Sequence, residues 1–242
     1  GRHKINDGYQ IGKEPQKSHF NSKDKMLGVS WYQSATFFTG NRLTVGFDYQ
    51  HFGGESWNKV LATGEHTPGV DKQMDEFAGY VDFRQDISSW FSLDAGIRVD
   101  HHSHVGTEWI PQGGLAFHLP KNAELKAMVS KGYRNPTIRE MYMFPPANPE
   151  LKPEKLINYE LSYSQRLLEG VLSYGISLYY INGDNLIMSN GLFPPLNINS
   201  GEIENWGVET NIGYHINSHW NVNANYSWLH MENPVLAAPE HK

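Results

Sequence analysis

The stretch RLTVGFDYQHF, from Arg42 to Phe52, alternates apolar and polar side chains. A period of two residues places the apolar side chains on one face of an extended strand and the polar side chains on the other. The apolar set is Leu43, Val45, Phe47 and Tyr49, and the polar set is Arg42, Thr44, Asp48 and Gln50. The stretch therefore predicts a β-strand with two chemically different faces.

The same alternation returns in WFSLDAGIRVD, LINYELSYSQR, VLSYGISLYY and HWNVNANYSWLH. The fold class that it predicts is all-β, an antiparallel up-and-down meander of about ten long strands. The predicted strands are residues 25–39, 41–52, 74–86, 90–101, 108–119, 122–132, 155–167, 170–182, 202–215 and 219–230. Most are longer than the roughly 5–6 residues of a globular strand. This length suits tilted strands that cross a bilayer, where about 9–11 residues lie in the hydrocarbon.

Short and long connections alternate between these strands. The short ones are residues 39–41, 86–89, 119–122, 168–170 and 216–219, and the long ones are 53–73, 102–107, 132–154 and 183–201. In a meander, alternate connections emerge at opposite ends of the sheet, so one end is predicted to carry tight turns and the other end large loops. Outer-membrane barrels have this asymmetry. We therefore predict part of a transmembrane β-barrel.

Composition and motifs exclude several function classes. Only 19% of the 242 residues are charged, the formal net charge is -6, and no Lys/Arg cluster supplies the basic surface that nucleic-acid binding needs. The absence of cysteine excludes disulfides and thiolate chemistry. No nucleophile elbow, P-loop or dinucleotide fingerprint is present. We predict no enzyme, no cofactor and no nucleic-acid partner.

The segment DHHSHVGTE is the best candidate metal site in the chain. His101, His102, His104 and Glu108 place imidazole and carboxylate donors within one short loop. Adjacent histidines at a strand end point to opposite faces, however, and polar residues are ordinary in a large loop. The sequence favours a structural role here and keeps metal binding as the alternative.

The connection at residues 132–154 is predicted to be stiff. Asn135 is placed to cap a short helical turn that Pro136 opens, and residues 137–142 would complete about one turn. Prolines then hold the chain extended, because each fixes its own φ and restricts the residue before it. These prolines are Pro145, Pro146, Pro149 and Pro153.

Three elements, GYRNPTIREMY, NPELKPEKLINYELSY and NINSGEIENWGVE, follow one another in this part of the chain. Together they resemble the C-terminal barrel signature of the TonB-dependent outer-membrane receptors, most specifically from about Phe91 to Tyr226. The matching residues are Arg134, Pro136 and Glu140, then Asn148, Pro149, Leu151, Pro153, Glu154, Tyr159 and Glu160, then Gly207, Val208 and Glu209. Three positions depart from the family pattern, namely Tyr133, Ser162 and Thr210.

The resemblance implies a barrel of about 22 strands, plugged by an N-terminal globular domain. Such a receptor binds and imports a scarce solute, for example a siderophore–iron chelate, cobalamin, haem or a glycan. Its energy comes from the TonB–ExbB–ExbD system, and its place is the outer membrane of a Gram-negative bacterium. Haem receptors tend to carry a histidine between the two proline-containing elements, and this chain has none there. Residues 1–242 would then be a partial barrel domain without the plug and the remaining strands.

The resemblance also assigns roles to the two faces of the sheet. Apolar side chains would meet outer-membrane lipid. Glu160 and Glu209 lie at positions that alternate onto the polar face, and they would contact the receptor's own plug domain. The long connections would recognise the small solute. The other charged residues on the polar parity are Arg42, Asp48, Asp82, Arg84, Asp94, Arg98 and Asp100. The alternative is a soluble or surface-attached β-sandwich that binds glycans and buries its apolar faces in a core, and strand length favours the receptor.

Overall fold

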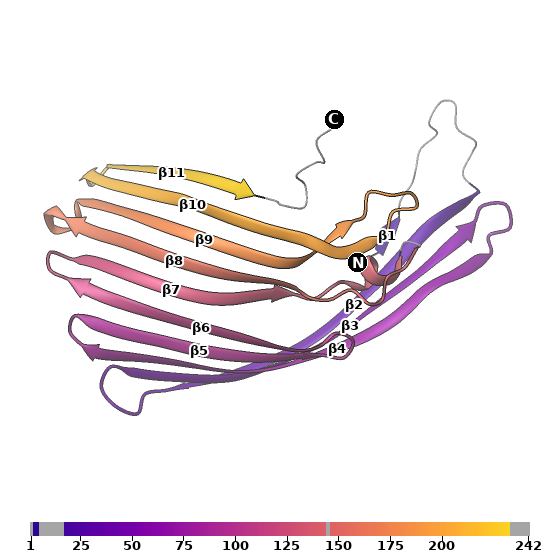
Figure 1. Ribbon diagram of the computed structural model, residues 1–242, viewed down its shortest axis with the longest axis horizontal. Helices are drawn as coiled ribbons and strands as arrows, with labels where there is room; N and C mark the ends of the chain where they lie inside the picture. Colours follow the sequence, from indigo (N-terminus) through magenta and orange to yellow (C-terminus); the bar gives the residue numbers. More distant parts are fainter. Residues whose placement is uncertain (1, 5–16, 144–145, 233–242) are drawn as a thin grey trace, which may run out of the picture.

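The computed structural model describes residues 2–4, 17–143 and 146–232, and its strands form a single antiparallel sheet in chain order (Figure 1). The strands are β1 (Arg2–Lys4), β2 (Ser18–Ala35), β3 (Asn41–Val60), β4 (His66–Ser88), β5 (Phe91–His102), β6 (Gly106–Leu119), β7 (Ala123–Arg134), β8 (Glu154–Leu167), β9 (Leu172–Ser189), β10 (Asn197–Asn217) and β11 (Trp220–Glu232). Two short helical turns accompany them, η1 (Arg139–Met143) and η2 (Leu168–Gly170).

The ten predicted strands are confirmed as β2 to β11, and each pairs with its neighbour in sequence. Tight turns join β2 to β3, β4 to β5, β6 to β7, β8 to β9 and β10 to β11, all at one end of the sheet (Figure 1). At the first of these turns Gly40 has a φ of +74°, which a residue without a β-carbon adopts at little cost. The longer connections leave from the opposite end, here called the loop end.

Two of the predicted long connections are shorter in the structure. Residues 53–73 were predicted as a loop, but β3 and β4 continue as a ladder to the pair Lys59 and His66. Gly53 and Gly54 resemble turn formers in the sequence, yet both are paired within this ladder. The prediction failed because a glycine also occurs where another segment approaches a strand closely. Likewise, β9 and β10 reduce the connection at 183–201 to residues 190–196.

The register separates the sheet into an apolar and a polar face. One row of directly paired residues crosses the sheet through Ala35, Leu43, Phe83, Ala95, Gly113, Val129, Tyr159, Tyr180, Trp206 and His230. The adjacent row from β2 to β8 is Ser34, Thr44, Asp82, Gly96, Gln112, Ser130 and Asn158. The first row lies on the face called outer here, and the second lies on the inner face. The two-face prediction from alternation is confirmed.

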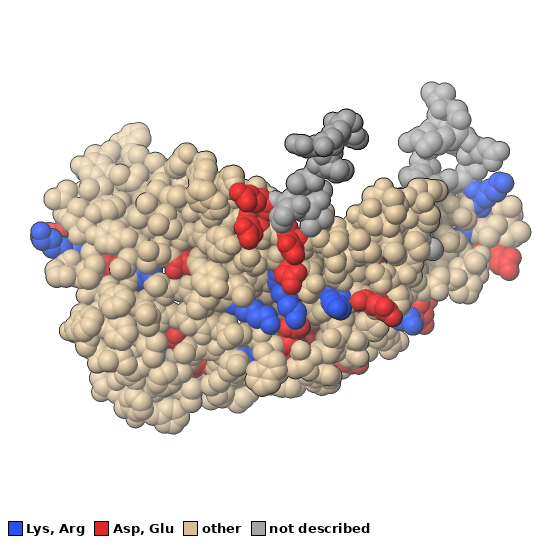
Figure 2. Space-filling view, in the orientation of Figure 1, with Lys and Arg blue, Asp and Glu red and all other residues tan. Residues whose placement is uncertain are grey.

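The outer face stays uncovered along the strands. Ile97 and Leu178 are 37% and 45% exposed, and no second sheet packs on them within the described residues. The β-sandwich alternative needs these side chains in a core, so the fold does not support it. In Figure 2 the visible surface near the tight turns carries few charged residues, and most charges lie towards the middle and the loop end. No helix in the described part of the chain is long and apolar enough to span a membrane.

Candidate functional site

The connection between β7 and β8 folds onto the inner face near the loop end. Its buried side chains Ile138, Met141 and Leu151 cluster with Met74 of β4, and Phe52 of β3 packs against them. Gly54 explains how close this approach is, because a β-carbon there would lie 3.1 Å from Cγ2 of Ile138. The segment is therefore packed against the barrel wall rather than extended into solvent.

Arg134, the last residue of β7, holds the two ends of this connection together. Its guanidinium donates to both carboxylate oxygens of Glu154, at 2.7 and 2.8 Å, and to both of Glu140, at 2.9 and 3.0 Å. Bidentate pairs of this kind match the planar fork of arginine. One side chain thus fixes the start of β8 and the helical turn η1 relative to the end of β7. This geometry gives a physical reason for the Arg134, Glu140 and Glu154 positions of the signature.

The helical turn is capped by Thr137 and not by Asn135, which corrects the prediction. Thr137 Oγ1 accepts a hydrogen bond from the Glu140 backbone N–H, and the Glu140 carboxylate accepts one from the Thr137 backbone N–H. This reciprocal arrangement is a capping box, in which the side chain three residues later closes the turn. Asn135 Oδ1 is instead buried without a partner among the described residues. The turn itself has π geometry over residues 139–143.

The environment of Glu140 favours its ionised form. Burial alone raises the pKa of this carboxyl, but the Arg134 guanidinium and the backbone and hydroxyl donors of Thr137 lower it further than burial raises it. The pKa of Glu140 therefore lies below its ordinary value. The carboxylate is charged, and paired with Arg134, at neutral pH.

Asparagine side chains tie the same connection to β10. Asn148 Nδ2 donates to the Asn197 carbonyl at 2.8 Å, and Asn197 Nδ2 donates to the Glu140 carbonyl at 3.0 Å. Asn199 Oδ1 accepts from the Lys152 N–H, and its Nδ2 donates to the Lys152 carbonyl at 2.9 Å. Backbone groups of a segment without strand partners are satisfied in this way. The second and third signature elements thus meet in space.

The remaining signature residues fall into two groups. Pro136, Leu151 and Pro153 are buried, and the Pro149 carbonyl lies 2.7 Å from His104 Nε2. On the strands, a β-carbon on Gly207 would lie 2.5 Å from both the Tyr179 hydroxyl and the Trp228 carbonyl oxygen, so this position requires glycine. Val208 lies on the outer face, two residues after Trp206 of the outer row, and pairs with Trp228 of β11.

Glu160 and Glu209 lie on the inner face, as the parity predicts. Glu160 pairs across the ladder with Met128 and Tyr179, and Glu209 pairs with Ser177. Within the described residues, neither carboxylate forms an ion pair. Tyr159, which directly precedes Glu160 in the signature, falls in the outer row and is 48% exposed.

The histidines of the candidate metal loop are directed at different partners. His101 Nδ1 lies 2.8 Å from Thr107 Oγ1, and His102 Nδ1 accepts the backbone N–H groups of residues 104 and 105. His104 Nε2 lies next to the Pro149 carbonyl and 3.3 Å from the Tyr142 hydroxyl. Glu108 forms ion pairs with Lys131 and Lys155 instead, at 3.0 and 2.6 Å. Among the described residues, no group of three or more such side chains is placed to hold a metal ion.

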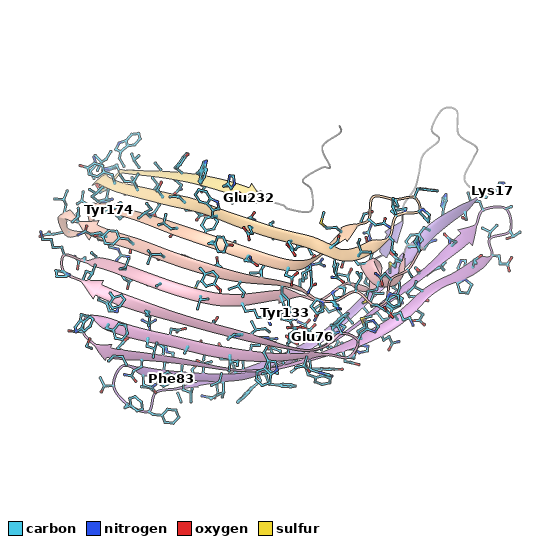
Figure 3. All side chains as sticks on the ribbon, viewed as in Figure 1. Lys17, Glu76, Phe83, Tyr133, Tyr174 and Glu232 are labelled. Atoms are coloured by element: carbon cyan, nitrogen blue, oxygen red, sulfur yellow. The ribbon has the colours of Figure 1, made fainter. Side chains whose placement is uncertain are left out.

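A cavity of about 920 Å³ lies between the inner face of β2 to β5 and the anchored segment at residues 133–143. Tyr133 and Glu76 lie side by side in its lining, and the Tyr133 hydroxyl donates to Glu76 at 3.0 Å (Figure 3). Arg98 contacts Asp48 and, at 3.2 Å, Asp100. Asp48, Arg98 and Asp100 were expected on this face from their parity.

Glu76 is the residue of this cavity that sequence reasoning missed. As half of the pair Asp75 and Glu76, it resembles a chance pair of surface carboxylates. The structure places the two side chains on opposite faces of the sheet. On the outer face, Asp75 accepts a hydrogen bond from the Tyr49 hydroxyl at 2.9 Å and contacts His51. Glu76 lines the cavity on the inner face. The predicted strand at residues 74–86 covers both positions, so its period of two places the two side chains on opposite faces. The sequence does not show that Tyr133, far away in the chain, meets Glu76.

Comparison with known proteins gives one family over nearly the whole chain. The family described as "TonB dependent receptor-like, beta-barrel" matches residues 2–242. The chain is 27% identical over 170 residues to the vitamin B12 transporter BtuB of Photobacterium profundum, covering 67% of this chain and 27% of that protein. It is 25% identical over 203 residues to the iron-regulated outer membrane virulence protein of Vibrio cholerae, covering 69% and 30%.

Solved structures show the same fold. The siderophore receptor PirA from Pseudomonas aeruginosa superimposes with a TM-score of 0.71 at 17% identity, over 90% of this chain and 42% of that chain. The copper transporter OprC gives 0.71 at 14% identity, over 88% and 38%. The match spans less than a third of the length of the two curated relatives, the vitamin B12 transporter and the virulence protein. Its sheet, its signature residues and these matches agree: the chain belongs to the TonB-dependent receptors, β-barrel proteins of the Gram-negative outer membrane.

Proposed function

We propose that this chain is part of an active-transport receptor, which binds a scarce solute at its loop end and imports it with energy from the TonB system. The observation that carries the proposal is the cavity between the barrel wall and the anchored β7–β8 connection. Pockets of this size, apolar with a few polar groups, are typical small-molecule sites. The names of similar proteins mention vitamin B12, siderophores, iron regulation and copper. The family is one of receptors and not of enzymes.

The inner face supports the proposed partnership with a plug domain. Glu160 and Glu209 are carboxylates without an ion pair in the described residues, and both lie on this face. Charges facing the interior of a barrel need polar partners or water. A plug domain with basic groups would supply such partners, and the outer face would meet lipid.

The test uses the full-length receptor in its native cells. Uptake of radiolabelled cyanocobalamin and of ⁵⁵Fe-labelled chelates is compared between the parent strain, a strain without the receptor gene, and parent cells treated with a protonophore. We expect one labelled solute to lose uptake in both the deletion strain and the treated cells, while surface binding persists in treated cells. Uptake that survives the protonophore would show a passive pore and contradict active transport.

A further inference from the structure

The cavity has an apolar part and a charged part. Phe52 of β3 and Ile138 and Met143 of the anchored segment contribute apolar surface to its lining. Glu76 and Asp100 contribute carboxyl groups, and both come from adjacent strands of the inner face. A solute that fills this space therefore needs apolar surface and at least one polar group.

The charged part contains more negative than positive groups. Arg98 is the cation there, and it is already shared between Asp48 and Asp100. Glu76 accepts a hydrogen bond from the neutral hydroxyl of Tyr133, and the neutral Asn135 side chain is a second donor to it. Two carboxyl groups of the lining, Glu76 and Asp100, thus share a partly buried place with one guanidinium that also pairs with Asp48, which leaves an excess of negative charge.

Two buried acceptor oxygens at the cavity also lack hydrogen-bond donors. Asp100 is only 3% exposed, and its Oδ1 has no hydrogen-bond donor among the residues that the structure describes. Asn135 Oδ1 is in the same situation. A buried acceptor without a donor destabilises the folded protein, and a bound solute that donates a hydrogen bond to it removes this penalty.

The other charged residues of the lining do not reverse this balance. Lys25 and Arg139 are cations, but both side chains are exposed, as is the carboxylate of Asp24. Exposed charges are screened by water and salt, whereas the buried carboxyl groups are screened much less. The less exposed charges of the lining are therefore Glu76, Asp100 and Arg98, and Asp48, outside the lining, neutralises part of the Arg98 charge.

We propose that this cavity is the part of the solute site that the chain supplies, and that it takes a solute with a cationic or donor-rich group rather than a polyanionic chelate. The inference rests on the proposed import function and narrows its substrate class. A polyanion would add like charge to the carboxyl groups of Glu76 and Asp100, while an ammonium, amide or hydroxyl group would supply the missing donors.

Four labelled probes of different charge test the proposal in cells that carry the full-length receptor. They are ferrioxamine B, which is cationic, ferrichrome and cyanocobalamin, which are neutral and rich in amide groups, and ferric enterobactin, which is polyanionic. We expect receptor-dependent uptake of at least one of the first three and none of ferric enterobactin. A strain without the receptor gene gives the background.

A pair of variants then locates the site. Glu76→Gln keeps the size of the side chain and removes its charge, and we expect it to raise the concentration for half-maximal uptake about tenfold. Asp94→Asn is the matched control, because Asp94 lies on the inner face of β5 outside the cavity, and its uptake should equal that of the parent. Immunoblots of outer membranes confirm equal amounts of each receptor.

The outcomes separate the inference from the proposed function. Uptake of ferric enterobactin through this receptor would overturn the inference and leave the import function standing. Uptake that Glu76→Gln affects no more than Asp94→Asn would also overturn it, and would indicate that another part of the receptor fills the cavity. If none of the four probes enters, the import function itself fails, and the inference fails with it.

Discussion

Arg134 is the residue on which the position of the β7–β8 connection depends most directly. It makes four hydrogen bonds to Glu140 and Glu154, and a lysine ammonium has neither the reach nor the fork geometry to replace them. Because the side chain is 44% exposed, water screens part of the interaction. We expect Arg134→Lys to lower the free energy of unfolding by about 1–2 kcal/mol, measured by urea titration of the receptor in detergent.

The control for this substitution is Arg84→Lys. Arg84 lies on the same face, but its guanidinium is 4.0 Å from the carboxylate of Asp86, which is too far for a hydrogen bond. Its side chain is 57% exposed. Its replacement should change stability by less than about 0.5 kcal/mol. Equal effects of the two substitutions would show that the Arg134 contacts contribute nothing specific.

Glu140 makes the stability of the same connection depend on pH. Its pKa is lower in the folded protein than the value of about 4.3 in the unfolded chain. Its contribution to the free energy of unfolding is therefore fully present above the unfolded-state pKa, and it is lost as the pH falls through the folded-state pKa. Glu140→Gln removes this contribution. In urea titrations, the parent should be more stable than the variant at pH 7, and the difference should shrink between about pH 4.5 and pH 3. A difference that stays constant over this range would contradict the assignment.

At the scale of the element, the strands were predictable because their two faces meet different surroundings. Alternation places Leu178 outward and Ser177 inward, and the ladder confirms this for both. The turn chemistry of Gly53 and Gly54 misled the prediction, since the role of Gly54 depends on Ile138, which is far away in sequence. The cap was missed for a related reason, because Asn135 and Thr137 are both good capping residues and only the contact with Glu140 decides between them.

The two faces of a single strand give the next prediction. Leu178→Lys places an ammonium group on the outer face at mid-strand and should cost about 2–4 kcal/mol, because that face meets hydrocarbon. Ser177→Lys, on the adjacent residue, points to the inner face and should cost much less. Refolding of both variants into lipid vesicles followed by urea titration measures the two costs. A similar loss for both would contradict a lipid-facing outer surface.

At the scale of the whole molecule, the signature residues of the site were predictable as a set, but their purpose was not. Resemblance identifies Arg134, Glu140 and Glu154 by position, whereas only the folded chain shows that the Arg134 guanidinium joins the two carboxylates. The cavity residue Glu76 belongs to no signature element, because its role arises from the packing of β4 against the end of β7. The signature residues therefore explain how the β7–β8 connection is anchored, and the inner-face residues form the cavity that this connection covers.

The sheet itself predicts a larger native protein. Its order runs from β1 to β11 without a pairing that returns β11 to β2, so strands beyond the described residues are needed to close a barrel. The curated relatives agree, because the chain matches only 27–30% of their length. An antibody raised against this chain should therefore detect, in the outer-membrane fraction of native cells, a band far above 27.6 kDa. A band near that mass in the soluble fraction would contradict the receptor assignment, because an open sheet with an apolar outer face requires both lipid and further strands.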